Sequence, residues 1–83
     1  MSLGSTFPGI ETADGGALGR TAFIAGTRIP VWLLQRYRQL GWSEARILSN
    51  YPDLRAADLV HAWDYVDAHR PEIELAIQEN EAA

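Results

Sequence analysis

The sequence contains no cysteine, no lysine and no long hydrophobic run. Without cysteine the chain forms neither disulfides nor thiolate metal sites, which agrees with a reducing compartment. No apolar stretch approaches the roughly 20 residues that a membrane-spanning helix needs, and no secretory signal is visible. We therefore expect a cytoplasmic protein that does not enter a membrane.

Positive charge is also scarce. The seven basic residues are all arginines, and eleven acidic residues give a formal net charge of −4. A strongly basic nucleic-acid-binding domain would have the opposite balance. Six of the seven arginines nevertheless precede Ala56, whereas the acidic residues concentrate after Asp53. A local basic face is therefore compatible with the acidic net charge.

Patterns typical of catalysis, metal binding or phosphate binding are missing as well. His61 and Asp64 have helical spacing, but no third ligand stands at an established distance from them. The glycine-rich stretch before Arg20 lacks the Lys-Ser/Thr ending of a phosphate-binding loop. No specific nucleophile–base–acid set can be assembled from the serines and histidines. We predict a non-enzymatic protein without a metal or cofactor.

The 83 residues permit a single domain. Residues 1–18 are rich in glycine, serine and threonine and lack periodicity, so we interpret them as a flexible arm. Within this arm, only Ile10 and Leu18 are expected to find a hydrophobic contact. The folded domain is expected to span residues 19–83.

The front of the domain, residues 20–29, is predicted to be a β-hairpin. Ala22-Phe23-Ile24 has the composition of a short strand, and Gly26 allows the positive φ of a turn before a second short strand. An isolated two-stranded ribbon is marginal in water, so its edge should be paired or covered, which favours a homodimer. The residues expected at a dimer or partner interface are Phe23, Ile24, Thr27, Arg28, Trp32, Ile73 and Ile77.

Four helices are expected, at about residues 30–40, 44–50, 56–69 and 72–80. Pro30 suits the first position of the first helix, and Gly41 suits its C-terminal end. Ser43 is the expected N-cap of the second helix. Arg55 is a poor cap for the third helix, but the carboxylate of Asp58 can accept a hydrogen bond from the backbone there.

Helical periodicity also predicts which sides of the helices are buried. In the first helix the apolar stripe comprises Leu33, Leu34, Tyr37 and Leu40, and Gln35 lies on the opposite, polar side. Trp32 is the exception on that polar side, and we expect it to pack against the hairpin or a second subunit. In the third helix the expected core face comprises Leu59, Ala62, Trp63 and Val66.

The second and third helices with the turn between them have helix-turn-helix dimensions. The polar sides of the third helix, however, contain Asp58, Asp64 and Asp67, whose carboxylates would be repelled by phosphates. Arginines elsewhere are better candidates for DNA contacts, with solvated surface or ion pairs to the acidic C-terminal half as the alternative. The candidate DNA-binding residues are Arg20, Arg28, Arg36, Arg38 and Arg55. Arg28 can instead bridge a carboxylate through both of its terminal nitrogens.

Several runs of the sequence resemble the domain-of-unknown-function family 433, a group of small bacterial and archaeal proteins that includes VapB-type antitoxins. These runs are Gly26-Thr27-Arg28-Ile29-Pro30-Val31-Trp32, Leu40-Gly41-Trp42-Ser43-Glu44, Ile47-Leu48, Tyr51-Pro52-Asp53-Leu54 and Asp58-Leu59. The resemblance covers about residues 19–68, with Arg55 where the family usually has threonine. It implies a mainly α fold: a short N-terminal β-hairpin followed by a three-helix, helix-turn-helix-like bundle and a C-terminal helix.

The resemblance also supplies the first of three functional hypotheses. The first is an antitoxin-like homodimer that neutralises a PIN-like ribonuclease toxin by direct binding, with operator DNA as a further partner still open. The second is a DNA-binding transcriptional regulator without a toxin. The third is a protein-interaction module that does not bind nucleic acid.

Overall fold

A computed structural model describes residues 7–14 and 20–82 of the chain, a β-hairpin followed by helices. The elements are the antiparallel strands β1 (Ile10–Asp14) and β2 (Arg20–Ile24) and the helices α1 (Val31–Gln39), α2 (Glu44–Asn50), α3 (Ala56–Ala68) and α4 (Arg70–Ala82). The predicted fold is thus confirmed: a short N-terminal hairpin, a three-helix bundle of helix-turn-helix type, and a C-terminal helix. None of the helices in these residues is long and apolar enough to cross a membrane.

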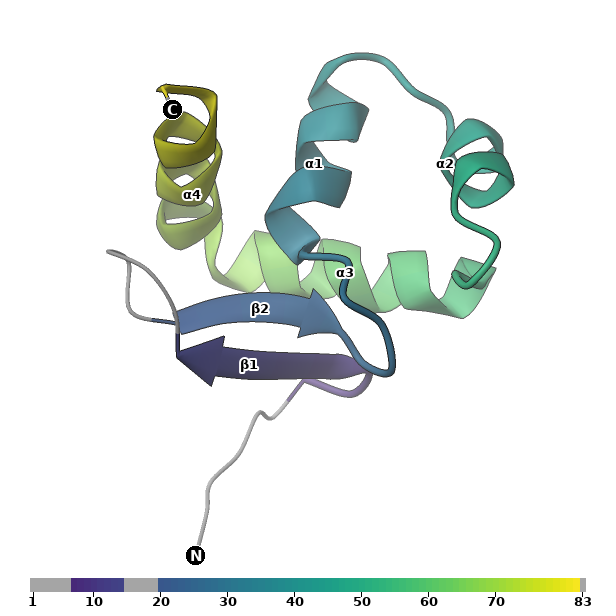
Figure 1. Cartoon of the computed structure of the whole chain (residues 1–83), viewed down its shortest axis with the longest axis horizontal. Coiled ribbons are helices and arrows are strands. Elements are labelled where there is room, and N and C mark those ends of the chain that lie inside the picture. The colour runs from purple at the N-terminus through teal and green to yellow at the C-terminus, as the bar shows by residue number, and fades with distance from the viewer. Residues whose placement is uncertain (1–6, 15–19, 83) are drawn as a thin grey trace, which may run out of the picture.

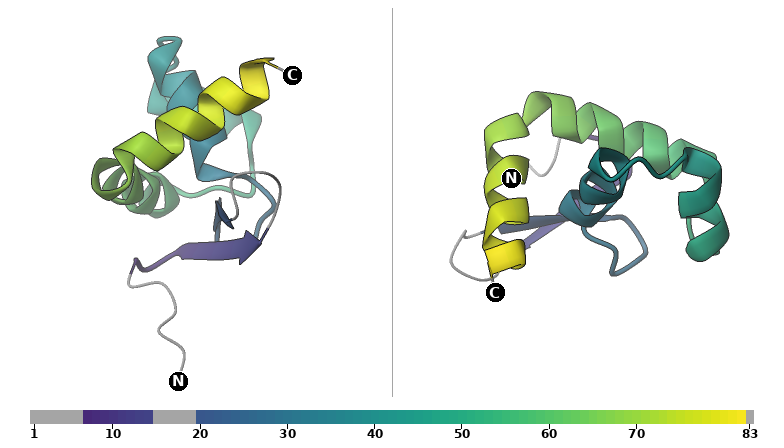
Figure 2. Two further views of the ribbon diagram at one scale, coloured as in Figure 1. Left: turned by 90° about the vertical axis from the view of Figure 1, so that its left-hand side faces the viewer. Right: turned by 90° about the horizontal axis from the view of Figure 1, so that it is seen from above.

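The helices and the hairpin form two layers. Figure 1 shows α4, α1 and α2 standing side by side above α3. In the same view the hairpin lies below α3. The left view of Figure 2 shows the hairpin below the helices, and the right view shows α4 turning away from α3 at their junction. Helix α1 contacts α2, α3 and α4, so it occupies the centre of the bundle.

The position of the hairpin corrects the sequence prediction. The partner of β2 is β1, which lies inside the stretch interpreted as a flexible arm, and not the segment after Gly26. That later segment contributes only an isolated bridge between Phe23 and Pro30. A full strand pair offers more backbone hydrogen bonds than a tight turn followed by three residues, and it also buries Ile10, as predicted. Leu18 lies outside the described residues.

The register of the hairpin determines which side chains face the helices. Ile10 pairs with Ile24, and Thr12 pairs with Ala22. Because side chains alternate along a strand, these pairs share one face, and burial of Ile10, Ala22 and Ile24 identifies it as the core face. The residues between them, Glu11, Ala13 and Phe23, therefore lie on the outer face.

One hydrophobic core connects the hairpin with all four helices. Its most deeply buried residues are Ile24, Val31, Leu34, Ile47, Leu59 and Val66, each with no measurable exposure. Ile73 and Ile77 of α4 belong to the same cluster. In the predicted core face of α3, Trp63 is only partly buried.

The predicted helix ends are largely confirmed. Ser43 Oγ accepts a hydrogen bond from the backbone N–H of Arg46 at 3.1 Å, and Asp58 Oδ2 accepts one from the backbone N–H of Arg55 at 2.9 Å. Gly41 has φ +91°, the left-handed conformation expected just after a helix. Helix α4 begins earlier than predicted, at Arg70, because the first helical turn tolerates a proline without a backbone N–H.

The buried side of α1 differs from the prediction. Gln35 is buried, whereas Leu40 is 56% exposed. Helix α4 packs on the side that was expected to be polar, where Gln39 Nε2 donates to Glu74 Oε2 at 3.0 Å and Arg36 pairs with Glu81. Leu40 follows the last helical residue, so it falls outside the packed stripe.

Candidate functional site: a groove on the outer face of the hairpin

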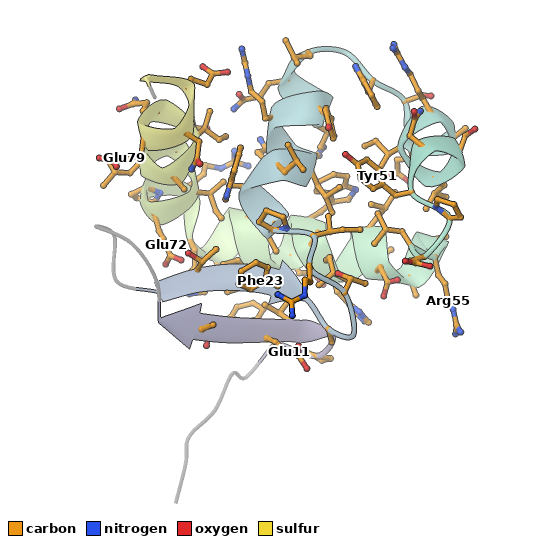
Figure 3. All side chains as sticks on the ribbon, viewed as in Figure 1. Glu11, Phe23, Tyr51, Arg55, Glu72 and Glu79 are labelled. Carbon is orange, nitrogen blue, oxygen red and sulfur yellow. The ribbon has the colours of Figure 1, made fainter. Side chains whose placement is uncertain are left out.

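A groove of about 950 Å³ lies between the outer face of the hairpin and the turn that joins α2 to α3. It is lined by the two strands β1 and β2, by the loop after β2 and by the α2–α3 turn. The lining residues are Glu11, Thr12, Ala13, Phe23, Gly26, Thr27, Arg28, Ile29, Tyr51 and Asp53. Figure 3 shows Glu11 and Phe23 on the hairpin and Tyr51 beside α2.

A network of short hydrogen bonds fixes the loop between β2 and α1. Thr27 Oγ1 donates to the carbonyl oxygen of Ile24 at 2.8 Å and accepts from the backbone N–H of Ile29 at 3.0 Å. The backbone N–H of Ile24 donates to the carbonyl oxygen of Ile29 at 3.0 Å. Gly26, at φ +79°, lets the chain reverse within this loop. Arg28 is thereby held, exposed, at the rim of the groove.

The groove combines an apolar surface with charges of both signs. Phe23 and Ile29 are partly buried hydrophobic residues within it, while Arg28, Glu11 and Asp53 are exposed. Within the described part of the chain no ion pair is found for Arg28, in contrast to the carboxylate bridge considered from the sequence. Partly exposed apolar surface rimmed by charged groups is typical of protein-binding sites.

Tyr51 joins the groove to the interior of the helical bundle. Its hydroxyl lies 2.8 Å from the hydroxyl of Tyr37. This hydrogen bond, followed by burial, raises the pKa of Tyr51 to about 12. The phenol therefore stays protonated at neutral pH.

The structure distributes the candidate interface residues between this groove and the core. Phe23, Thr27 and Arg28 line the groove. Ile24, Ile73 and Ile77, by contrast, are at most 4% exposed and pack inside their own chain, so they are not available as surface. The sequence prediction placed them at an interface because it did not anticipate how closely α4 and the hairpin fold back onto α1 and α3.

Trp32 meets one of the two expectations for it, contact with the hairpin. It lines a small cavity of about 40 Å³ together with Thr21 and Ala22 of β2 and Ile73 and Ala76 of α4. Trp32 is partly buried and packs against the core of its own chain, beside the hairpin and the C-terminal helix.

The candidate DNA-binding arginines do not converge on one face. Arg36 pairs with Glu81 of α4, whereas Arg55 is exposed at the start of α3, at the other end of the molecule (Figure 3). Arg38 lies over the Trp63 ring, and Arg28 lines the groove. The side chain of Arg20 lies outside the described part. The exposed residues of α3 include Val60, Asp64 and Asp67, which do not favour contact with phosphates.

Sequence reasoning missed the contribution of β1 to the groove. Glu11 and Ala13 alternate with the inward residues Ile10 and Thr12, a strand signal that the surrounding glycines and threonines obscured. The two sequence runs that were singled out, Gly26-Thr27-Arg28-Ile29 and Tyr51-Pro52-Asp53, do meet in the groove although more than twenty residues separate them.

Comparison with known proteins identifies the family and a solved structure of similar fold. The model of a protein family of unknown function, DUF433, matches residues 8–66, and therefore includes β1 as well as the helical motifs. A similar solved structure is that of a DUF433 member protein from Anabaena variabilis ATCC 29413, with 41% sequence identity and a TM-score of 0.76. The similarity covers 84% of this chain and 68% of that chain. A search of curated protein sequences finds no match.

Proposed function

Because the chain belongs to the DUF433 family, we propose that it is an antitoxin-like protein that neutralises a PIN-like ribonuclease toxin by binding it directly. The observation that carries this proposal is the groove, in which the two most distinctive sequence runs of the chain lie side by side. Its partly exposed apolar residues, and Arg28, for which no ion pair is found among the described residues, suit a protein partner. In this proposal the protein acts in the cytoplasm, where it meets the toxin.

The proposal also includes a homodimer. A domain of this size buries only about 60% of the surface of its unfolded chain, so it gains stability from association. Light scattering is expected to give twice the mass of 9.2 kDa, and a monomer at micromolar concentration would remove the dimer from the proposal.

A second candidate function is a DNA-binding regulator without a toxin. The favouring observation is the succession of α2, a tight turn and α3, with Arg46 exposed on α2 and Arg55 exposed where α3 begins. Asp64 and Asp67 on the exposed side of α3 act against insertion of this helix into a groove of DNA. We therefore place direct binding of the toxin first and operator binding second.

The test uses co-expression with the nuclease encoded in the neighbouring reading frame. The unmodified protein is expected to co-purify with the nuclease and to suppress its cleavage of RNA. Phe23→Asp and Arg28→Glu alter the groove without touching the core, so each is expected to weaken the complex at least about tenfold.

Val60→Ser, on the exposed side of α3, is the matched control and should bind the nuclease normally. Circular dichroism confirms that each variant is folded. The absence of a complex with the unmodified protein, or full binding by both groove variants, would refute the proposal. A salt-sensitive complex with promoter DNA in place of the nuclease would support the second candidate.

A further inference from the structure

Two arginines lie over the rings of two tryptophans in the helical part of the molecule. The Cζ atom of Arg38 on α1 is 4.2 Å from the centre of the Trp63 ring on α3. The Cζ atom of Arg46 on α2 is 4.0 Å from the centre of the Trp42 ring in the α1–α2 loop. Both guanidinium groups are exposed, and both indoles are half-buried. We refer to these four residues as the arginine–tryptophan patch.

Further contacts hold both rings in place. Trp63 Nε1 donates a hydrogen bond to Glu44 Oε2 at 2.9 Å. Trp42 stacks on Tyr37 with ring centres 4.2 Å apart and planes inclined by 14°. Because the indoles are fixed, stacking restricts the arginine side chains before any partner arrives. Binding then costs less side-chain entropy than it would for freely moving arginines.

The guanidinium groups of the patch have N–H donors that can bind a further partner. Within residues 7–14 and 20–82, Arg36 and Arg70 form ion pairs with carboxylates, whereas no such pair is found for Arg38 or Arg46. Among the described residues, the hydrogen-bond acceptor of Arg38 is the amide oxygen of Gln35, at 3.3 Å. A guanidinium stacked on a ring still presents N–H groups along its edge, and these match the two oxygens of a carboxylate.

We propose that the arginine–tryptophan patch binds a carboxylate-bearing segment of a protein partner. Arginine and tryptophan dominate the residues that contribute most to protein interfaces, and the pair of exposed cations complements an acidic segment. Nucleic acid fits less well, because a duplex carries a dense row of phosphates, about one negative charge per 1.7 Å, which a chain of net charge −4 with Asp64 exposed beside Trp63 repels more strongly than a short acidic segment. This inference concerns a surface other than the groove and does not depend on the partner proposed for the groove.

The experiment is a titration of the full ¹⁵N-labelled chain with an oligoglutamate peptide, followed by NMR. The indole N–H signals of Trp42 and Trp63 are expected to shift together. Replacement of both arginines by glutamine, in R38Q/R46Q, should weaken binding by about tenfold or more. The variant R38K/R46K should also bind less tightly although its charge is unchanged, because an ammonium group lacks the planar fork of a guanidinium.

Two further variants separate the patch from general charge effects. Glu44→Gln keeps an acceptor for Trp63 Nε1 but removes the neighbouring negative charge, so it should bind oligoglutamate more tightly. Arg70→Gln removes one positive charge at the α3–α4 junction and should leave the affinity unchanged. Unshifted indole signals, or equal affinity of R38Q/R46Q and the unmodified chain, would overturn the inference. Tighter binding of a DNA duplex than of the peptide would also overturn it, in favour of nucleic acid.

Discussion

Gly9 shows how strongly a single position can depend on its neighbour across the fold. It has φ +77°, and a Cβ atom added to it would lie 2.2 Å from Nδ1 of His61. That nitrogen is buried and has no hydrogen-bond partner among the described residues. The backbone before β1 therefore packs directly on the imidazole of α3, and this contact requires a residue without a side chain.

Gly9→Ala is accordingly expected to be among the most destabilising small substitutions in the chain. Positive φ costs an alanine about 1–2 kcal/mol, and the clash with His61 adds about 1–3 kcal/mol. Denaturant-induced unfolding gives the change in the free energy of unfolding.

Gly26→Ala provides the matched control for that measurement. Gly26 has nearly the same φ, +79°, but an added Cβ would meet no atom within 4 Å. Gly26→Ala should therefore lower the free energy of unfolding by only about 1–2 kcal/mol. In a chain that already carries His61→Ala, the loss of stability caused by Gly9→Ala should fall to a similar value. Equal effects of the two glycine substitutions in the unmodified chain would show that the contact with His61 contributes nothing.

At the scale of elements, the start of α3 is stabilised in an unusual way. Arg55 precedes the helix with an extended backbone, φ −117° and ψ 163°, but no oxygen in its side chain can cap the first turn. Asp58 compensates by accepting the backbone N–H of Arg55, and its charge also interacts favourably with the helix dipole. The carboxylate thus satisfies the backbone N–H of Arg55, while Arg55 supplies no side-chain acceptor for the N–H groups of the first turn.

Asp58→Ala is expected to lower the free energy of unfolding by about 1 kcal/mol, whereas Asp64→Ala, in the exposed middle of the same helix, should change it by less than about 0.5 kcal/mol. Arg55→Thr should raise it by about 0.5–1 kcal/mol, since a threonine hydroxyl supplies the missing acceptor. Thermal unfolding monitored by circular dichroism checks all three. No loss of stability in the Asp58 variant would mean that solvent caps the helix equally well.

The elements themselves followed well from local sequence signals. The side chains of Ser43 and Asp58 accept hydrogen bonds from backbone N–H groups three residues away. Gly41 takes the positive φ that ends α1. These effects were predictable because each acts within about one helical turn. The strand β1 was not predicted, because a strand is stabilised by a partner that local composition does not reveal. The buried side of α1 was mispredicted for a related reason: α3 and α4 both pack against α1, and no pattern within α1 indicates that these neighbours bury Gln35.

At the scale of the whole molecule, the hydroxyl pair of Tyr37 and Tyr51 links the bundle to the groove. Tyr37 belongs to α1, and Tyr51 follows α2 and lines the groove. The same Tyr37 stacks on Trp42, which lies under Arg46. A continuous series of contacts therefore joins the groove to the arginine–tryptophan patch.

The folded chain is expected to lose stability in alkaline solution as Tyr51, which is hydrogen-bonded to Tyr37, becomes ionised. The pKa of Tyr51 is raised from 10.0 to about 12 in the folded chain, so the unfolded chain loses its proton first as the pH rises. The stabilisation is complete below pH 10 and is lost as the pH approaches about 12. Unfolding of the unmodified chain and of Tyr51→Phe, measured across this range, should show a smaller alkaline loss for the variant. Parallel curves would contradict the raised pKa.

The sequence alone determined the order and approximate limits of the helices and contained the runs that identify the family, and the family resemblance implied a mainly α fold with an N-terminal hairpin. The helix limits depend on interactions between residues a few positions apart, which the chain specifies before it folds. Only the tertiary structure decided that β1 pairs with β2, that Ile24, Ile73 and Ile77 are core residues, and that two distant runs meet in one groove. It also decided which arginines lie on tryptophans and which pair with carboxylates. Such outcomes depend on which surfaces the packed helices and hairpin cover, because a side chain becomes core or surface only when its neighbours are in place.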